Sequence, residues 1–383
     1  MMRQSLCRYN GFVRVRLGRG AIATLLVLLC SLTLAAPARA DEQFDVGASP
    51  VLNVQLSQGH LTVQTWDRSQ VQISSDQPVD VQHLSPSEVD PREPKQIQIS
   101  SQSIQTAHGR VTLPAESFVL PDIPGTQHDA IVARGAGNVT ITIPRTTGIV
   151  IAHVRAGQLT LNGYHGIFVA HTRAAGITLN DVGGTGFVES LRGKIVATNS
   201  SFDRLRVRSA TGNMLFQGCT SHQIQATSSY GSIVYDNGHF QPGLARFESE
   251  HGNVALGVQG GAQIGAHSGS GHVVSSFHEE ANVRGNPATK QATVHGGGPV
   301  VTATSKNGSV YLYSGSINEH PRVRQELNGS ARLPVRNYPA ASRYPAPPNV
   351  TPNARPPFPR PGSFPRPPPP FGRPPQHPGR PPV

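Results

Sequence analysis

Apolar and polar residues alternate along much of the chain, in short segments that each follow a glycine. An apolar side chain stands two residues after the glycine and another stands four residues after it, as in "SATGNMLF" from Ser209 and "SSYGSIVY" from Ser228. Alternation with a period of two predicts a β-strand with one buried face. The first inward positions are Leu61, Val111, Val139, Leu159, Ile195, Met214, Ile233, Val254, Val273 and Val310, and the second are Val63, Leu113, Ile141, Leu161, Ala197, Phe216, Tyr235, Leu256 and Leu312.

The glycines themselves recur at nearly constant intervals. Separations of 19, 17, 19, 19, 21 and 19 residues connect Gly157, Gly176, Gly193, Gly212, Gly231, Gly252 and Gly271, while Gly137 precedes and Gly308 follows this series. Gly59 and Gly109 begin earlier, irregularly spaced copies, and the copy at Gly176 is one residue out of step. A serine three residues before several of the glycines is expected to bond the backbone of the turn, and the glycine is expected to allow a left-handed conformation there.

A second alternating segment follows in each repeat, as in "IFVAHT", "LRVRSA", "IQATSS" and "IGAHSG". The inward positions predicted for these segments are Ile167 and Val169, Leu205 and Val207, Ile224 and Ala226, and Ile264 and Ala266. A unit of about 19 residues with two strands is too short to close a core of its own, but stacked copies cover one another. The pattern therefore predicts an all-β fold, a right-handed β-helix or β-solenoid, with a β-sandwich as the alternative.

The pattern also divides the chain. Residues 1–40 form a predicted signal peptide, 41–136 irregular N-terminal strands, 137–316 the regular repeats, 317–337 a linker and 338–383 a disordered tail rich in arginine and proline. Insertions interrupt the repeats at residues 83–95, 114–129 and 278–299, and each is either a binding loop or simply a tolerated insertion.

These glycine-anchored repeats after a signal peptide resemble the bacterial adhesin-like family DUF4097, over residues 51–313. The resemblance implies an extracytoplasmic β-solenoid with an adhesive or other interaction role. It carries over no catalytic residues, and the family pattern does not require the long tail.

The two termini account for the positive charge of the chain. Residues 1–40 contain six arginines and no acid, with an apolar run and then Ala38-Arg39-Ala40, which is typical of a secretory signal cleaved after Ala40. An N-terminal membrane anchor is the alternative. Eight arginines and no acid follow from Arg332 onward, so the part between carries 19 basic and 22 acidic residues. The charge balance of the middle part argues against a nucleic-acid partner. The predicted signal peptide indicates an extracytoplasmic location, either secreted, periplasmic or at the cell surface.

The tail from Tyr338 favours an extended polyproline conformation with regularly placed arginines. It is interpreted as a spacer, as a contact to an anionic envelope polymer or membrane surface, or as a peptide ligand. A polysaccharide or a surface protein is the other predicted partner.

Candidate chemistry is sparse. Sugar cleavage by a β-helix enzyme, the alternative function, generally needs two facing carboxylates, whereas Glu248, Glu250, Glu279, Glu280, Asp181, Asp203 and Asp236 occupy predicted turns and insertions. His153, His165 and His171 fall in one repeat and His267, His272 and His278 in another, without the spacing of a metal site. Stacking is expected to bring His251 close to His272. We therefore predict no catalytic, cofactor-binding or metal-binding residues, and no cofactor.

One cysteine remains after the signal peptide, so no disulfide within the chain is expected. Cys219 in "FQGCTSH" is interpreted as a small buried side chain, with a reactive thiol as the alternative.

Overall fold

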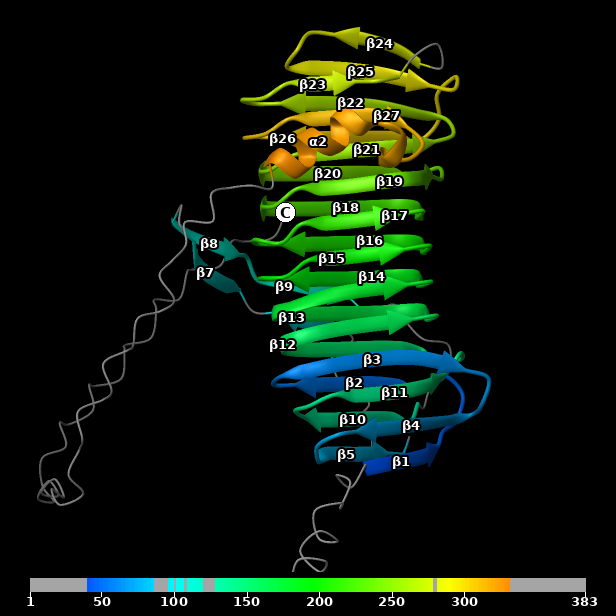
Figure 1. The fold of residues 1–383 in the computed structure, drawn as a ribbon. Coiled ribbons are helices and arrows are strands. Elements are labelled where there is room, and N and C mark those ends of the chain that lie inside the picture. The colour runs from blue at the N-terminus through cyan, green and yellow to red at the C-terminus, as the bar shows by residue number, and fades with distance from the viewer. Residues whose placement is uncertain are drawn as a thin grey trace, which may run out of the picture. The chain divides into compact units, whose positions relative to one another are not determined.

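The computed structural model describes residues 40–85, 96–99, 101–106, 109–119, 128–277 and 281–330. In these ranges the protein is a stack of β-strands with one α-helix, α2 (Pro321–Ser330), and one short 3-10 helix, η1 (Ile317–Glu319) (Figure 1). Apart from Ala40, the predicted signal peptide lies outside the described residues, and so does the predicted proline-rich tail.

The middle of the stack is built of rungs, each of which supplies a strand to two parallel ladders. Strands β12 (Ile149–Asn162) and β13 (His165–Asn180) each run through a whole rung. The next rungs divide into pairs, which are β14 (Gly183–Ser190) with β15 (Ile195–Thr198), β16 (Ser201–Ser209) with β17 (Met214–Gln217), β18 (Thr220–Tyr230) with β19 (Ile233–Phe240), and β20 (Leu244–His251) with β21 (Val254–Gln259). Ile195 pairs with Met214 and Met214 with Ile233, which is the predicted step of 19 residues.

At the N-terminal end, the order of the rungs in space differs from their order in the sequence. The rung of β2 (Val51–Leu56) and β3 (Gly59–Trp66) pairs in parallel with β12 on one side. On its other side it pairs with the later rung of β10 (Ala130–Gly135) and β11 (Val139–Pro144). Strands β4 (Gln70–Ser75), β5 (Val79–Leu84) and β1 (Ala40–Asp45) then close this end in antiparallel pairing. Residues 51–66 thus belong to the same stack as the regular repeats.

The C-terminal end has the same kind of interleaving. The last rung, β26 (Val300–Ser305) and β27 (Val310–Ser314), lies between the rung of β20 and β21 and the rung of β22 (Ala262–Ser268) and β23 (Val273–Ser275). Strands β25 (Thr289–Val294) and β24 (Ala281–Gly285) cover β22 in antiparallel order. The expectation that His251 and His272 lie on adjacent rungs is therefore wrong, because residues 300–314 separate them. His251 instead stacks on Tyr230, with the ring centroids 4.4 Å apart.

A column of glycines joins the rungs at one corner of the stack. A Cβ atom added to Gly212 would lie 1.7 Å from the carbonyl oxygen of Gly193, and one added to Gly231 would lie 2.3 Å from that of Gly212. From Gly212 onward, glycine is thus required by the close approach of two backbones. The earlier glycines have a positive φ, which also favours glycine; they are Gly59, Gly137, Gly157 and Gly193. The serine at this corner acts as predicted, since Ser209 Oγ accepts a hydrogen bond of 2.8 Å from the Gly212 amide.

The core lies between the ladders and contains the predicted inward positions of the rungs. Aromatic rings of Phe216, Tyr235, Phe240 and Phe247 pack against one another there. Buried positions that follow the predicted glycines include Leu61, Val139, Leu159, Ile195, Met214, Ile233, Val254, Val273 and Val310.

Two details of the predicted pattern are wrong. In "IFVAHT" Phe168 and Ala170 lie in the core between the ladders, whereas Ile167 is half-buried and Val169 is buried at the groove on the outer face. Both phases of this segment are apolar, so alternation could not select one, and the missing side chain of Gly186 makes room for the Phe168 ring. In the next turn Ala175, not Gly176, occupies the glycine column, because Gly157 pairs with Ala175.

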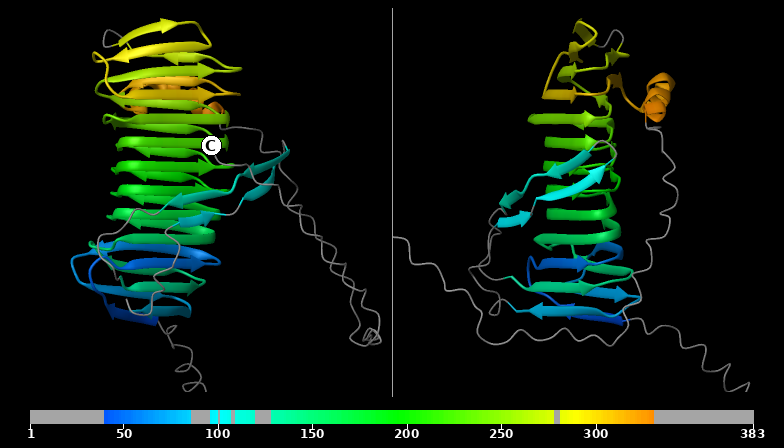
Figure 2. Two further views of the ribbon diagram at one scale, coloured as in Figure 1. Left: turned by 180° about the vertical axis from the view of Figure 1, so that it is seen from behind. Right: turned by 90° about the vertical axis from the view of Figure 1, so that its left-hand side faces the viewer.

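The excursion between β5 and β10 contains two antiparallel pairs outside the ladders. These are β6 (Gln96–Ile99) with β9 (Glu116–Val119) and β7 (Gln102–Thr106) with β8 (Gly109–Leu113). Both lie along the side of the stack (Figure 2). Ile104, Val111 and Leu113 pack on Leu191, Ala210 and Tyr230 of the rungs. The copy at Gly109 is therefore a hairpin on the outer face of the stack and not a rung.

The segment expected to be a linker contains η1 and α2. Val323 and Leu327 of α2 cover Ala255, Tyr311 and Tyr313 on the outer face of the last rungs. Asp236, which is buried, accepts a hydrogen bond of 2.6 Å from the Ile317 amide and so holds the start of this segment. Among the described residues no helix combines the length and the apolar character needed to cross a membrane.

Candidate functional site

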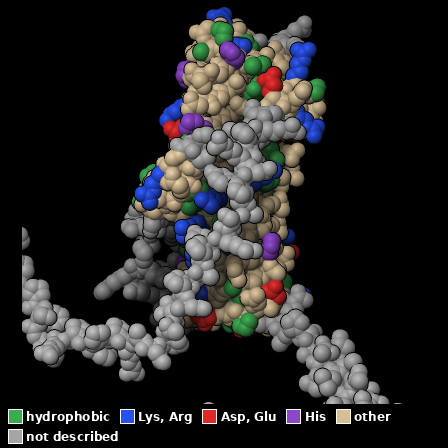
Figure 3. Space-filling view, turned by 60° about the vertical axis from the view of Figure 1, so that its left-hand side comes forward, with side chains coloured by type: hydrophobic (Ala, Val, Ile, Leu, Met, Phe, Trp, Pro, Cys, Tyr) green, Lys and Arg blue, Asp and Glu red, His purple; other side chains and the backbone are tan. Residues whose placement is uncertain are grey.

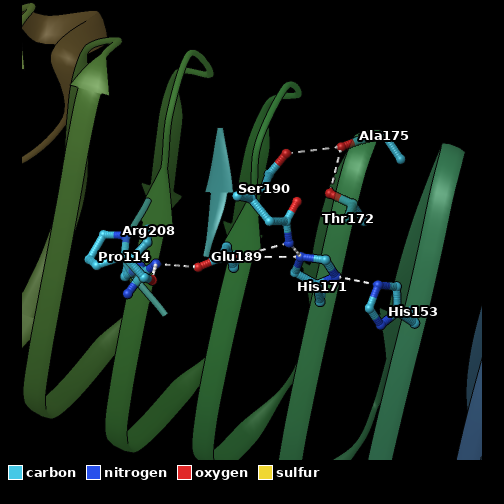
Figure 4. Close-up of polar contacts among 9 residues, drawn as sticks. Pro114, His153, His171, Thr172, Ala175, Glu189, Ser190 and Arg208 are labelled. Atoms are coloured by element: carbon cyan, nitrogen blue, oxygen red, sulfur yellow. Dashed lines mark hydrogen bonds and ion pairs between the residues drawn. The ribbon is translucent and has the colours of Figure 1, made fainter. Parts of the chain in front are cut away.

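A column of polar side chains crosses the outer face of the stack where the excursion covers it. His153 on β12 is paired in register with His171 on β13, His171 with Glu189 on β14, and Glu189 with Arg208 on β16. Neighbouring strands lie about 4.8 Å apart, so side chains at matching positions touch across the rungs. Four strands therefore place these four side chains in one row, which we call the polar column (Figure 4).

The contacts within the polar column are continuous. His171 Nδ1 lies 2.6 Å from His153 Nε2, and His171 Nε2 lies 3.4 Å from Glu189 Oε1. Arg208 Nη2 forms an ion pair of 2.7 Å with Glu189 Oε2. Glu189 is 0% exposed and His171 is 4% exposed, so the carboxylate has exchanged water for these partners.

The excursion is fastened to the polar column at two points. Arg208 Nη2 donates a hydrogen bond of 2.8 Å to the carbonyl oxygen of Pro114. On the other side of Glu189, Gln102 Nε2 contacts His171 Nε2 and lies 3.5 Å from Glu189 Oε1. The hairpin of β7 and β8 is thus held by both polar contacts and the apolar contacts described above.

Burial and charge determine what the polar column can do chemically. A carboxylate paired with a guanidinium and closed off from solvent is a poor candidate for proton transfer to a polymer substrate. Partial loss of hydration, followed by repulsion from His171, lowers the pKa of His153 from 6.5 to about 4, although Glu189 opposes this shift. The His153 ring still faces solvent on one side.

An open groove of about 1010 Å³ begins where the polar column ends, between the excursion and the rungs of β2, β10, β12 and β13. Both histidines of the polar column contribute to its wall. The other charged or polar lining residues are Arg134, Arg155, Arg173, Gln55, Ser57, Ser101, Gln102 and Ser103, and no acidic side chain of the described residues lines the groove.

The structure brings together only part of the histidine sets named from the sequence. His153 and His171 meet, whereas His165 lies 3.7 Å from Asp181 and His267 contacts Thr289. His272 is exposed and His278 lies outside the described residues. Within the described ranges, no group of three or more histidine, cysteine, aspartate or glutamate side chains is arranged to hold a metal ion.

The carboxylates considered for sugar cleavage are dispersed. Glu248 is paired with Arg246, Glu250 with Lys306, and Asp236 holds the C-terminal segment. Asp181 has a positive φ in a turn and Asp203 lies on β16, while Glu279 and Glu280 lie outside the described residues. Sequence reasoning overlooked Glu189 and Arg208. Their positions 18 and 37 residues after His171 repeat the interval of the rungs, and this was the available signal.

Cys219 is a buried side chain, as interpreted from the sequence. Its exposure is 1%, and Sγ donates to the carbonyl oxygen of Ala197 at 3.5 Å. Burial raises the pKa of the thiol from 9.0 to about 11, so it stays protonated at neutral pH and is a poor nucleophile.

The chain is similar to one known protein family over most of its described length. The family described as Toastrack DUF4097 matches residues 52–312. A solved structure described as "a putative cell adhesion protein from Clostridium sporogenes" is 10% identical, with a TM-score of 0.24, and the match covers 72% of this chain and 99% of that chain. A comparison with curated proteins gives no match.

Proposed function

The chain belongs to the Toastrack DUF4097 family, and from this premise we propose that it is a non-enzymatic structural or interaction protein of the cell envelope. The predicted N-terminal signal sequence would take it out of the cytoplasm, and the stack would serve as a rigid support for binding surfaces. We also propose that its repeats of about 19 residues coil in a right-handed sense.

The state of Glu189 is the observation that supports this function most. Its carboxylate lies beside the groove, where it could act on a bound sugar, yet it is buried and paired with Arg208. Acid–base cleavage of a sugar requires a carboxylate in reach of the glycosidic oxygen and a second one opposite. The groove lining supplies arginines and histidines instead, which suit binding of a partner.

A binding and cleavage experiment with purified envelope fractions and polysaccharides tests the proposal. The mature protein and a chain lacking residues 338–383 are compared at low and at physiological salt, and the polymers are analysed for new ends. We expect binding without cleavage. Salt-sensitive binding that is lost with the tail would assign attachment to the tail, and binding that persists would assign it to the stack.

Two results would contradict the proposed function. Failure to bind any envelope fraction would remove the interaction role. Cleavage of a polysaccharide that is abolished by Glu189→Gln, in a variant with an unchanged circular dichroism spectrum, would identify an enzyme.

A further inference from the structure

The groove beside the polar column has an unusual charge for a protein whose middle part carries more acidic than basic residues. Among the residues that the structure describes, three arginines and two histidines line it, and no aspartate or glutamate does. The arginines are exposed, and none of the ion pairs between described residues involves them. Exposed guanidinium groups that have no carboxylate partner in the described part of the chain are available to a ligand.

The rungs arrange these guanidinium groups in rows. Arg155 and Arg173 occupy matching positions on β12 and β13, since the residues on either side of them pair as Val154 with Thr172 and Ala156 with Ala174. Arg134 lies one rung beyond β2, where it pairs with Gln55, and Gln55 pairs with His153. Arg155 and Arg173 therefore lie about one strand spacing of 4.8 Å apart, whereas Arg134 lies two rungs from Arg155 and matches the position of His153, two residues earlier along the strand.

The excursion supplies the opposite wall. Ser101, Gln102 and Ser103 contribute uncharged hydrogen-bonding groups, and the contacts of Gln102 with His171 and of Arg208 with Pro114 hold this wall at the stack. Lys and Arg side chains also lie along the middle of this side of the stack in the space-filling view (Figure 3). A groove with guanidinium groups on several rungs and uncharged polar partners suits an extended chain that carries anionic groups.

We propose that this groove binds an acidic polysaccharide, with uronate carboxylates on Arg173, Arg155 and Arg134. Guanidinium groups form paired hydrogen bonds with carboxylates, and the serine and glutamine side chains of the excursion bond the sugar hydroxyls. The bound polymer would cross the rungs, because the three arginines lie on different rungs. This inference rests on the proposed function and specifies its ligand.

The test measures binding of polygalacturonate to the full chain and to Arg155→Ser/Arg173→Ser. The matched control is Arg204→Ser/Arg246→Ser, which removes the same charge from exposed arginines outside the groove. All three proteins retain the same tail, so its contribution is common to them. Neutral dextran serves as the uncharged polymer, and sodium polyphosphate as an anionic polymer without sugar.

We expect the groove variant to bind polygalacturonate at least tenfold more weakly than the wild type, with less than a twofold change in the control and no binding to dextran. Equal weakening in both variants would overturn the proposal, because charge alone would then account for binding. Equal or stronger binding of polyphosphate, lost in the same groove variant, would replace the uronate ligand by a polyphosphate. Unchanged polygalacturonate binding in the groove variant, together with retention of envelope binding, would refute the groove while leaving the proposed function intact.

Discussion

At the scale of single residues, the buried ion pair in the polar column governs how the outer face is closed. Glu189 gives up its hydration on a face of the sheet that is otherwise open to water, and Arg208 and His171 compensate for that loss. A charge buried in this way is costly once its partner is removed. The stability of this outer face therefore depends on the excursion that covers the ion pair.

The substitution Arg208→Met tests this dependence. It leaves the Glu189 carboxylate buried without its ion pair and removes the bond to Pro114, so we expect a loss of about 3–5 kcal/mol in the free energy of unfolding. Urea denaturation measures the loss, and limited proteolysis is expected to cut the excursion sooner. The double variant Glu189→Leu/Arg208→Met, which removes both charges, should recover a large part of the stability; a loss as great as that of the single variant would contradict the argument.

The pKa of His153 predicts a dependence of stability on pH. In the unfolded chain this histidine binds a proton below about pH 6.5, whereas in the folded protein it does so only near pH 4. The unfolded state thus binds more protons in this window, and the folded state loses stability as the pH falls from 6.5 to 4. Because solvent reaches the ring and screens its charge, we expect an effect on the order of 1 kcal/mol.

Thermal unfolding of the wild type and of His153→Gln between pH 7 and pH 4 measures this effect. The groups that face His153 are His171 and, beyond it, Glu189, and both remain in the variant. The variant is expected to lose less stability than the wild type over this range, while His222→Gln, at an exposed position, should follow the wild type. Parallel curves for all three proteins would show that His153 does not contribute.

At the scale of the elements, the glycine column sets how closely the rungs approach. The substitution Gly212→Ala puts a methyl group 1.7 Å from the Gly193 carbonyl oxygen, so two backbones must separate. We expect a loss of about 3 kcal/mol in the free energy of unfolding. Gly265→Ala on β22 is the control, since nothing lies within 4 Å of its added Cβ, and it should be neutral or slightly stabilising. Similar losses for both variants would mean that close approach is not the cause.

The sequence predicted the elements better than their order. Alternation after each glycine located the strands and their buried side chains, because each rung must bury one face against the next. It could not determine the phase of "IFVAHT", where four consecutive residues are apolar, nor could it recognise that Ala175 replaces a glycine. The polar column was missed because its members come from four rungs and belong together only once the rungs are in register. The groove was missed for the same reason, since one of its walls is an insertion.

At the scale of the whole molecule, both ends of the described stack are interleaved. The rung of β26 and β27 lies inside the stack although it comes last in the sequence. The earlier rung of β22 and β23 pairs with this last rung and is joined to the rest of the ladders by that pairing. A chain ending at residue 277 should therefore lose protection from hydrogen exchange in β22 and β23, although both strands are still present. A chain ending at residue 316, which lacks η1, α2 and the tail but keeps every rung, should retain it. Persistent protection of β22 in the shorter chain would contradict the interleaved order.

The interleaving also has a consequence for biosynthesis. Residues 51–66 leave the ribosome early but must wait for residues 130–162 before both of their neighbours exist, and residues 244–275 wait likewise for residues 300–314. Only the central rungs can assemble in the order of translation. Each end is completed by a late segment that enters between two partners already made, so ribosome-bound nascent chains should acquire protease resistance in steps, with the final step after residue 314 has emerged.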